Sequence, residues 1–154
     1  MRRELLRILD ANFNRSREGL RVCEEITRFI LTSRALTSEL RSVRHGISGI
    51  MRHFLVKPRL MAGSPAIKGM LLESRDSEND IGRPPRLNNQ ARQFDSGDIF
   101  ISNIERVKES LRVLEEFFKL IDKKKARVFS NLRFKTYDIE KKVIKRIATL
   151  RNIK

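Results

Sequence analysis

Charged residues suited to handling phosphate groups lie at helical spacing in segment 12–25, which reads NFNRSREGLRVCEE. Glu18 follows Arg15 by three residues and Glu25 follows Glu18 by seven, so a helix places all three on one face. Arginine binds phosphate oxygens through paired N–H groups, and carboxylates orient arginines or hold a metal ion. The alternative is a ladder of helical salt bridges, each stabilising by about 0.2–0.5 kcal/mol: Arg15–Glu18, Glu18–Arg21 and Arg21–Glu25.

The same pattern occurs twice in the chain. Segment 103–116 reads NIERVKESLRVLEE and matches segment 12–25 at eight of 14 positions, at an offset of 91 residues. At an offset of 92, SELRSVRHGI (38–47) matches SNLRFKTYDI (130–139), with Ser, Leu, Arg and Ile in common. Most of the duplicated residues are polar, so core packing does not account for them. Their functional interpretation is a pseudo-symmetric polar pocket between the two copies.

Apolar residues recur at helical spacing on either side of a segment, 57–97, that holds all the prolines. A helical hairpin has one apolar face that it cannot bury alone. We therefore predict an all-α fold, in which two repeated hairpins pack as a four-helix bundle and form one helical domain, 1–154. The expected helices are 2–32, 35–56, 98–122 and 124–152, with repeat one over about 2–56 and repeat two over about 98–152.

The connection at 57–97 is longer than the ~12–15 residues usual for a structureless loop. It contains Arg75, Asp76 and Asp80, and two aspartates four residues apart beside an arginine are suited to hold Mg2+ and a polyphosphate. The alternative is a flexible, solvated, charged loop. Our hypothesis is that the connection folds over the bundle as a lid.

The composition narrows the class of protein. The 154 residues carry a formal net charge of +15, which favours anionic partners. Nucleic acid is disfavoured, because the charge is spread along the chain and no aromatic stacking platform accompanies it. The one cysteine, Cys23, excludes a disulfide framework and a zinc site with two cysteine ligands, and it favours a reducing compartment, the cytoplasm. No membrane partner is expected, since no apolar run approaches the ~20 residues of a membrane span and the N-terminus lacks a signal peptide's apolar region.

One long motif resembles a known family. It reads Arg7-Ile-Leu-Asp10-Ala-Asn12-x-Asn14-Arg15-x-Arg17-Glu18-Gly19-Leu20-Arg21-Val22-x-Glu24-Glu25-x-x-Arg28-Phe29. Four further motifs agree with it: Leu40-Arg41-x-x-Arg44-His45, Ser74-Arg75-Asp76-x-x-x-Asp80-x-Gly82, Asn103-x-x-Arg106-x-x-Glu109-x-Leu111-Arg112-x-Leu114-Glu115-Glu116 and Arg133-x-x-x-Tyr137-x-x-Glu140. Over nearly the whole chain, these motifs resemble the helical module that is fused in front of some bacterial thiamine-phosphate synthases and is sometimes encoded alone.

The resemblance implies a kinase of thiamine biosynthesis. Such a kinase phosphorylates 4-amino-5-hydroxymethyl-2-methylpyrimidine phosphate to the diphosphate, with ATP and Mg2+. The implied partners are the phosphorylated pyrimidine and a nucleoside triphosphate, with thiamine-phosphate synthase and a second copy of the chain as further candidates. The synthase barrel is missing from this sequence, so we expect a stand-alone kinase or a piece of a longer protein, without synthase activity. The alternatives are an accessory or regulatory module of a synthase, with the polar stripe as its interface, and a basic helical nucleic-acid-binding protein.

The motif positions and their physical roles together give the candidate site. A substrate phosphate oxygen would attack, so charge neutralisation matters more than a strong general base. Candidate catalytic residues are Arg15, Glu18, Arg21, Glu25 and Arg106. Candidate phosphate-binding residues are Asn12, Arg17, Arg41, Arg44, His45, Arg75 and Arg112, and candidate metal ligands are Asp76 and Asp80, with the duplicated glutamates as further ligands.

The two copies differ in ways that favour the first as the active one. Copy one has Asn14, Arg17 and Gly19, where copy two has Glu105, Lys108 and Ser110. A duplicated site often keeps one copy active and the other structural.

Overall fold

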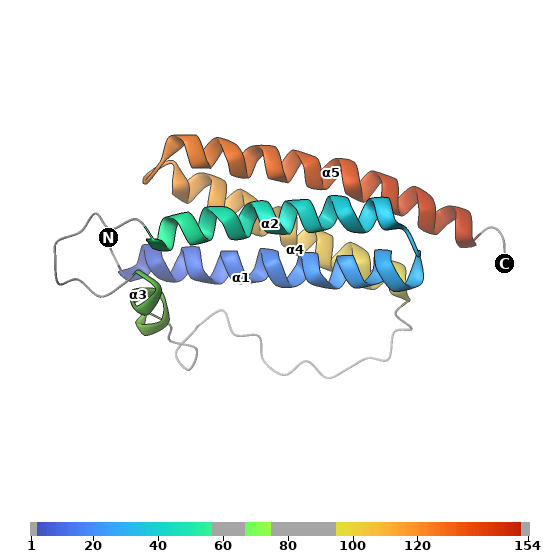
Figure 1. Cartoon of the computed structure of the whole chain (residues 1–154), viewed down its shortest axis with the longest axis horizontal. Helices are drawn as coiled ribbons and strands as arrows, with labels where there is room; N and C mark the ends of the chain where they lie inside the picture. Colours follow the sequence, from blue (N-terminus) through green and yellow to red (C-terminus); the bar gives the residue numbers. More distant parts are fainter. Residues whose placement is uncertain (1–2, 57–66, 75–94, 152–154) are drawn as a thin grey trace.

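The computed structural model describes residues 3–56, 67–74 and 95–151, and within them every regular element is a helix (Figure 1). This confirms the predicted all-α class. The elements are α1 (Arg3–Glu25), the π-helix η1 (Ile26–Ile30), α2 (Arg34–Val56), α3 (Ile67–Glu73), α4 (Ser96–Phe118) and α5 (Lys123–Arg151).

The four long helices form the predicted bundle of two hairpins. Helix α1 packs against α2 and α4, and α5 packs against α4 and α2. Each of these neighbours runs antiparallel to the helix beside it (Figure 1). The first hairpin is therefore α1–α2 and the second is α4–α5, and every helix contacts its own partner and one helix of the other copy.

The helices differ from the prediction at the end of the first helix, at the end of α4, which stops at Phe118 instead of residue 122, and in the presence of α3. The first helix does not continue as an α-helix to residue 32, because its last turn widens into η1, where the Leu31 N–H donates to the Ile26 carbonyl at 3.0 Å. Thr32 then takes a positive φ of 46°, which stops the helix. Helix α3 was not predicted. It packs on α1 and α2 from within the expected connection, and the rest of that segment, 57–66 and 75–94, lies outside the described residues.

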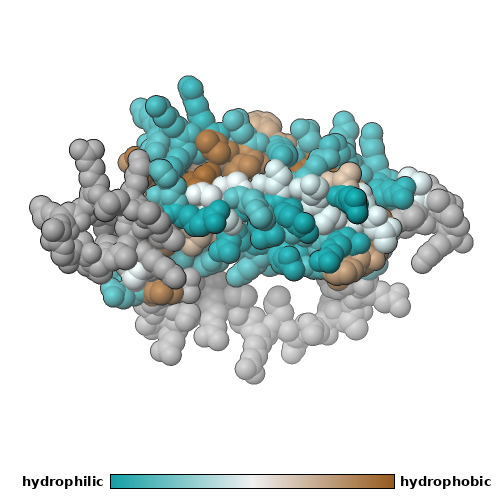
Figure 2. Space-filling model, in the orientation of Figure 1, coloured by the Kyte–Doolittle hydropathy of each residue, from teal (hydrophilic) through white to brown (hydrophobic). Residues whose placement is uncertain are grey.

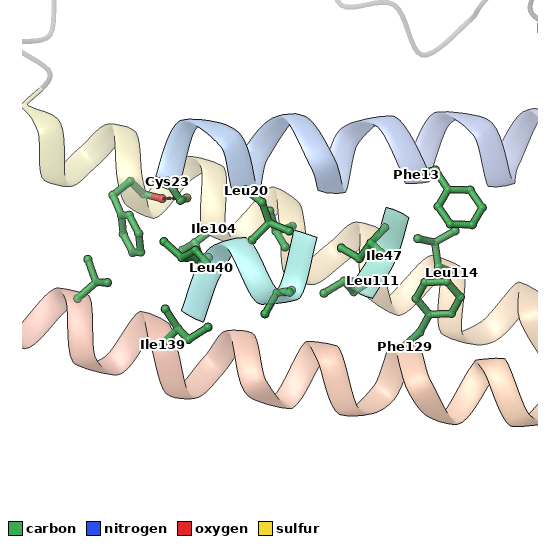
Figure 3. Close-up of a cluster of buried hydrophobic side chains, with 14 of the residues drawn as sticks. Phe13, Leu20, Cys23, Leu40, Ile47, Ile104, Leu111, Leu114, Phe129 and Ile139 are labelled. Carbon is green, nitrogen blue, oxygen red and sulfur yellow. Dashed lines mark hydrogen bonds between the residues drawn. The ribbon is translucent and has the colours of Figure 1, made fainter. Parts of the chain in front are cut away.

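The core is apolar and runs the length of the bundle. Phe13, Phe118 and Phe129 have no exposed surface and pack edge to face or tilted, with ring centroids 4.9–6.0 Å apart. Figure 3 shows Phe13 and Phe129 in this cluster, with Leu20, Leu40 and Ile104 further along. Aliphatic and aromatic burial of this kind is the main force that holds the two hairpins together.

Helices α1 and α4 approach closely because Gly19 has no side chain. A Cβ atom at this position would lie 2.8 Å from Cγ2 of Val107 and 2.9 Å from the carbonyl oxygen of Asn103. The contact leaves room for apolar packing and for little else. None of the helices in the described part of the chain is long and apolar enough to span a bilayer.

Candidate functional site

The strongest polar feature of copy one is a carboxylate held by arginines between α1 and α2. Glu24 is only 2% exposed, and Arg44 donates to both of its carboxylate oxygens, through Nε to Oε1 and through Nη2 to Oε2 at 3.1 Å. Arg21 and Arg41 lie further from the same carboxylate, at 3.8 and 3.9 Å, and their side chains are about half exposed. We call Arg21, Glu24, Arg41 and Arg44 the copy-one clamp.

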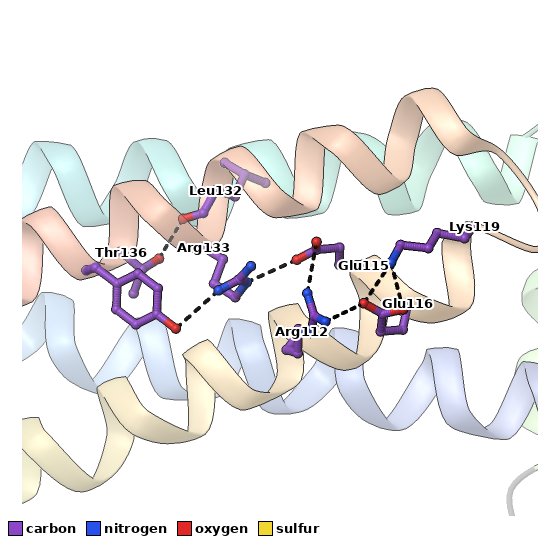
Figure 4. Close-up of polar contacts among 8 residues, drawn as sticks. Arg112, Glu115, Glu116, Lys119, Leu132, Arg133 and Thr136 are labelled. Carbon is purple, nitrogen blue, oxygen red and sulfur yellow. Dashed lines mark hydrogen bonds and ion pairs between the residues drawn. The ribbon is translucent and has the colours of Figure 1, made fainter.

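Copy two has a related arrangement between α4 and α5, in which Arg133, the equivalent of Arg41, binds the carboxylate and Thr136 stands at the position of Arg44. Glu115 accepts from Nε of Arg133 at 3.0 Å and from Nη1 of Arg112 at 3.2 Å (Figure 4). Arg133 also donates to the hydroxyl of Tyr137 at 3.2 Å. We call Arg112, Glu115 and Arg133 the copy-two clamp.

The repeat extends to matching contacts in both copies. Arg21 pairs with Glu25 at 2.7 Å, and Arg112 pairs with Glu116 at 2.8 Å. The amides of Asn12 and Asn103 each donate to the carbonyl four residues earlier, at 2.8 Å. The duplication in the sequence is therefore a duplication of interactions, and Asn12 has a structural partner within its own helix.

The two clamps do not meet in a pocket between the copies, contrary to the prediction. Each carboxylate pairs with arginines of its own hairpin, because the surface between α1 and α4 is occupied by the close contact at Gly19 and by buried residues such as Leu20 and Val107. The duplicated polar residues therefore form two separate sites, one on each hairpin.

Hydrogen bonds in and beside the clamps shift the pKa values of Arg44, Arg133 and Glu116 in the direction that favours the charged form. The hydrogen bond to Glu24 raises the pKa of the Arg44 guanidinium above its ordinary value. The hydrogen bond to Tyr137, with that to Glu115, raises the pKa of Arg133. In copy two, the hydrogen bond from Lys119 lowers the pKa of Glu116. The half-exposed arginines Arg21, Arg41 and Arg112 lie on the outer side of the clamps.

The copies differ beside the clamps, at Lys108 and its equivalent Arg17. Lys108 is 12% exposed, and its Nζ donates to Glu105 at 2.6 Å and to Glu140 at 2.7 and 2.9 Å. Burial acts to lower the pKa of Lys108, but these hydrogen bonds raise it above its ordinary value. Arg17 has no carboxylate partner within the described ranges; its Nη1 contacts the Met51 sulfur at 3.8 Å.

Several predicted site residues lie on the outer surface of α1, α2 and α4. Arg15, Glu18, His45 and Arg106 are exposed. The predicted pairs Arg15–Glu18 and Glu18–Arg21 do not form among the described residues, whereas Arg21–Glu25 does. The ladder fails at Glu18 because Arg21 turns toward the carboxylates on its C-terminal side, at Glu24 and Glu25.

Figure 2 shows a mostly hydrophilic face over the bundle, with hydrophobic side chains in its upper part, where α5 lies. An exposed cation on this surface that forms no ion pair with the described residues can bind an anionic ligand.

No carboxylate cluster suited to a metal ion is found in the described part of the chain. Four of the six duplicated glutamates are already paired with arginines: Glu24, Glu25, Glu115 and Glu116. The other two, Glu18 and Glu109, are exposed. The predicted ligands Asp76 and Asp80 and the predicted phosphate-binding Arg75 fall outside the described residues.

The sequence analysis did not identify which residues of the duplicated segments lie at the centre of the two clamps. Glu24 and Glu115 are buried, and they entered the prediction only among the duplicated glutamates, as further metal ligands. Arg133, which binds Glu115, and the pair Lys108–Glu140 were not among the candidates. The signal was present, because Glu24 and Glu115 are identical in the two copies and Arg133 follows in the second echo. What the pattern lacked was the helix phase that turns Glu24, rather than Glu25, toward α2.

The chain is similar to one module of larger proteins. A family model described as the ThiD2 family matches residues 7–142. A thiamine-phosphate synthase of Rhodopirellula baltica is 33% identical over 135 residues, which are 88% of this chain and 33% of that protein. One of Synechocystis sp. is 35% identical over 136 residues, 88% of this chain and 35% of that protein. The chain therefore spans about one third of the length of the curated relatives it matches. No solved structure matches it.

Proposed function

The chain belongs to the ThiD2 family, and on that premise we propose that it is a phosphotransferase of thiamine biosynthesis. It transfers the γ-phosphoryl group of ATP to 4-amino-5-hydroxymethyl-2-methylpyrimidine phosphate and forms the diphosphate. The observation that carries the proposal is the family match over residues 7–142, a range that includes both clamps.

The proposed reaction requires neutralisation of the phosphate charges, and the arginines of the clamps are suited to supply it. A phosphate oxygen of the pyrimidine substrate forms a bond to the γ-phosphorus while the bond from that phosphorus to the β,γ-bridging oxygen breaks, and ADP leaves. Both reactants are polyanions, so the barrier falls when fixed cations meet the phosphoryl oxygens. Arg21 and Arg41 are suited to this role, because they lie 3.8 and 3.9 Å from the Glu24 carboxylate while about half of each side chain stays exposed.

Magnesium supplies further neutralisation of the phosphates when it is bound. The clamp glutamates Glu24 and Glu115 are engaged with arginines, and the proposed ligands of the ion are Asp76 and Asp80. The role of the clamp glutamates is then to orient arginines, which agrees with their burial and their hydrogen bonds.

The test is a phosphoryl-transfer assay with the purified chain, the pyrimidine phosphate, ATP and Mg2+, and separation of the products by ion exchange. Diphosphate is expected to form, and Arg41→Gln is expected to lower its rate by at least tenfold. Arg127→Gln is the matched control, because Arg127 is an exposed arginine of α5 outside both clamps. Failure to form diphosphate with any nucleoside triphosphate or divalent metal would contradict the proposal.

A second candidate function is an accessory module of thiamine-phosphate synthase. The observation in its favour is that the chain covers one third of relatives that carry this name. This function predicts a stable complex with a synthase in gel filtration and a change in synthase rate, without diphosphate formation by the chain alone. Loss of the complex in Arg41→Gln, but not in Arg127→Gln, would identify the clamp face as the interface.

A further inference from the structure

One buried polar atom of the described residues has no hydrogen-bond partner, and it belongs to Arg17. Its Nε is buried and meets no acceptor. The Nη1 group reaches only the Met51 sulfur, at 3.8 Å, and a thioether is a weak acceptor. A buried donor on a cation is costly when it stays unpaired, since the charged group has lost water without gaining a partner.

The second copy shows how the same position is neutralised from within. Lys108, the equivalent of Arg17, binds Glu105 on its own helix and Glu140 on α5. The offsets of 91 and 92 residues place Asn14 at the position of Glu105 and Ser48 at the position of Glu140. Copy one therefore keeps the cation and replaces both carboxylates by small neutral groups that can donate hydrogen bonds.

The equivalence of the two copies relates these neutral groups to Arg17. Asn14 precedes Arg17 by three residues on α1, and Ser48 precedes Met51 by three residues on α2, which is about one helical turn in each case and, because the two helices run antiparallel, in opposite directions along the bundle. Since Glu105 and Glu140 both contact Lys108, their equivalents Asn14 and Ser48 are expected near Arg17, on the two sides of its contact with Met51. Both Asn14 and Ser48 are partly buried.

We propose that Arg17, Asn14 and Ser48 form an oxyanion-binding site for a phosphate group in copy one, and that Glu105 and Glu140 close the equivalent site in copy two. The edge of the guanidinium that bears Nε and Nη2 offers two parallel N–H groups, which match two oxygens of a phosphate. Because Nε is buried, phosphate binding requires neighbouring side chains to move, and the Met51 side chain beside Nη1 is flexible. The assignment of that phosphate to the pyrimidine substrate rests on the proposed function, whereas binding of phosphate itself does not.

The decisive variant is Ser48→Glu, which supplies in copy one the carboxylate that Glu140 supplies in copy two. The probes are inorganic phosphate and pyrophosphate, titrated calorimetrically into the full chain. Wild type is expected to bind one equivalent, and Ser48→Glu is expected to weaken binding by at least tenfold while the melting temperature stays equal or rises. Ser48→Gln is the comparison that isolates charge, because glutamine has the size of glutamate without its charge, and it is expected to weaken binding clearly less than Ser48→Glu does.

Two results would contradict the proposed site. One is absence of phosphate and pyrophosphate binding by wild type, and the other is equal weakening of binding by Ser48→Glu and Ser48→Gln, which would make the effect steric.

The opposite exchange, Glu105→Asn with Glu140→Ser, frees Lys108 and is expected to raise the number of phosphates bound per chain from one to two. If phosphate binding follows these rules but no diphosphate forms in the kinase assay, the proposed function fails and the anion site stands. If diphosphate forms and Ser48→Glu binds phosphate normally, the site fails and the function stands.

Discussion

Replacement of Glu24 by glutamine tests whether the clamp is a buried electrostatic unit or a surface salt bridge. Glu24 is 2% exposed, and the side chain of Arg44, which donates two hydrogen bonds to it, is 21% exposed. Loss of one partner of a fully buried pair costs about 3–5 kcal/mol, because the other charge is left unpaired. Arg44 recovers part of this through water, so we expect Glu24→Gln to destabilise the fold by about 2–3 kcal/mol.

The neighbouring residue provides the control for this magnitude. Glu25 pairs with Arg21 on the same helix, but the two side chains are 36% and 56% exposed. Pairs of this kind contribute about 0.3–0.5 kcal/mol. Glu25→Gln makes the same chemical change one residue away, so the difference between the two variants isolates the effect of burial.

The measurement is urea unfolding followed by circular dichroism at 222 nm (helical signal, since the chain has no tryptophan). At ~2–4 °C per kcal/mol for a chain of this size, Glu24→Gln is also expected to lower the melting temperature by about 4–12 °C. Equal destabilisation by Glu24→Gln and Glu25→Gln would refute the reasoning. So would a coupling energy near zero in a double-mutant cycle with Arg44→Met.

Three further predictions concern packing, reactivity and pH. Gly19→Ala is expected to destabilise the fold by about 1–3 kcal/mol in thermal melts, because its Cβ would lie 2.8 Å from Cγ2 of Val107; Gly49→Ala, with nothing within 4 Å, should instead be neutral or stabilising. Burial, with smaller effects of nearby glutamates, raises the pKa of the Cys23 thiol to about 12, so Ellman's reagent at pH 8 should label it only after unfolding. Hydrogen bonding from the Lys125 N–H lowers the pKa of Asp122, so this cap stabilises α5 above the ordinary value of 3.8 and loses its effect as pH falls through the lower folded value. Asp122→Ala should therefore cost about 1 kcal/mol at pH 7 and much less at pH 2 in urea titrations.

The helices and their pairing were predictable, because the apolar residues that recur at helical spacing in the sequence are the residues that the fold buries. Leu9, Phe13 and Leu20 recur at helical spacing in α1 and are all fully buried. The repeat then fixed the architecture, since two copies of one amphipathic hairpin have few ways to cover their apolar faces. By contrast α3, with seven residues, is too short to produce a periodic signal.

The arrangement of the site was less predictable, because it depends on helix phase and on the distance between helices. Successive residues on a helix point about 100° apart, so Glu24 and Glu25 face different surroundings although both are duplicated. The sequence alone does not show that Gly19 brings α1 and α4 too close for a polar pocket. A pocket between the copies was therefore a reasonable hypothesis, and the close helix contact is the physical reason that it was wrong.

The difference between Arg17 and Lys108 has a consequence for stability. The fold can neutralise a cation at this position, since Lys108 has two carboxylates in contact. Copy one leaves Arg17 with a buried, unpaired Nε, and an unpaired group of this kind weakens the folded state. A carboxylate at position 48 would remove this cost in stability. Its absence is consistent with a role of Arg17 in binding, because a cation that is already paired within the protein cannot also pair with a charged ligand. On this argument Ser48→Glu should gain stability and lose phosphate binding together; a variant that gained stability and still bound phosphate would separate the two and place the anion elsewhere.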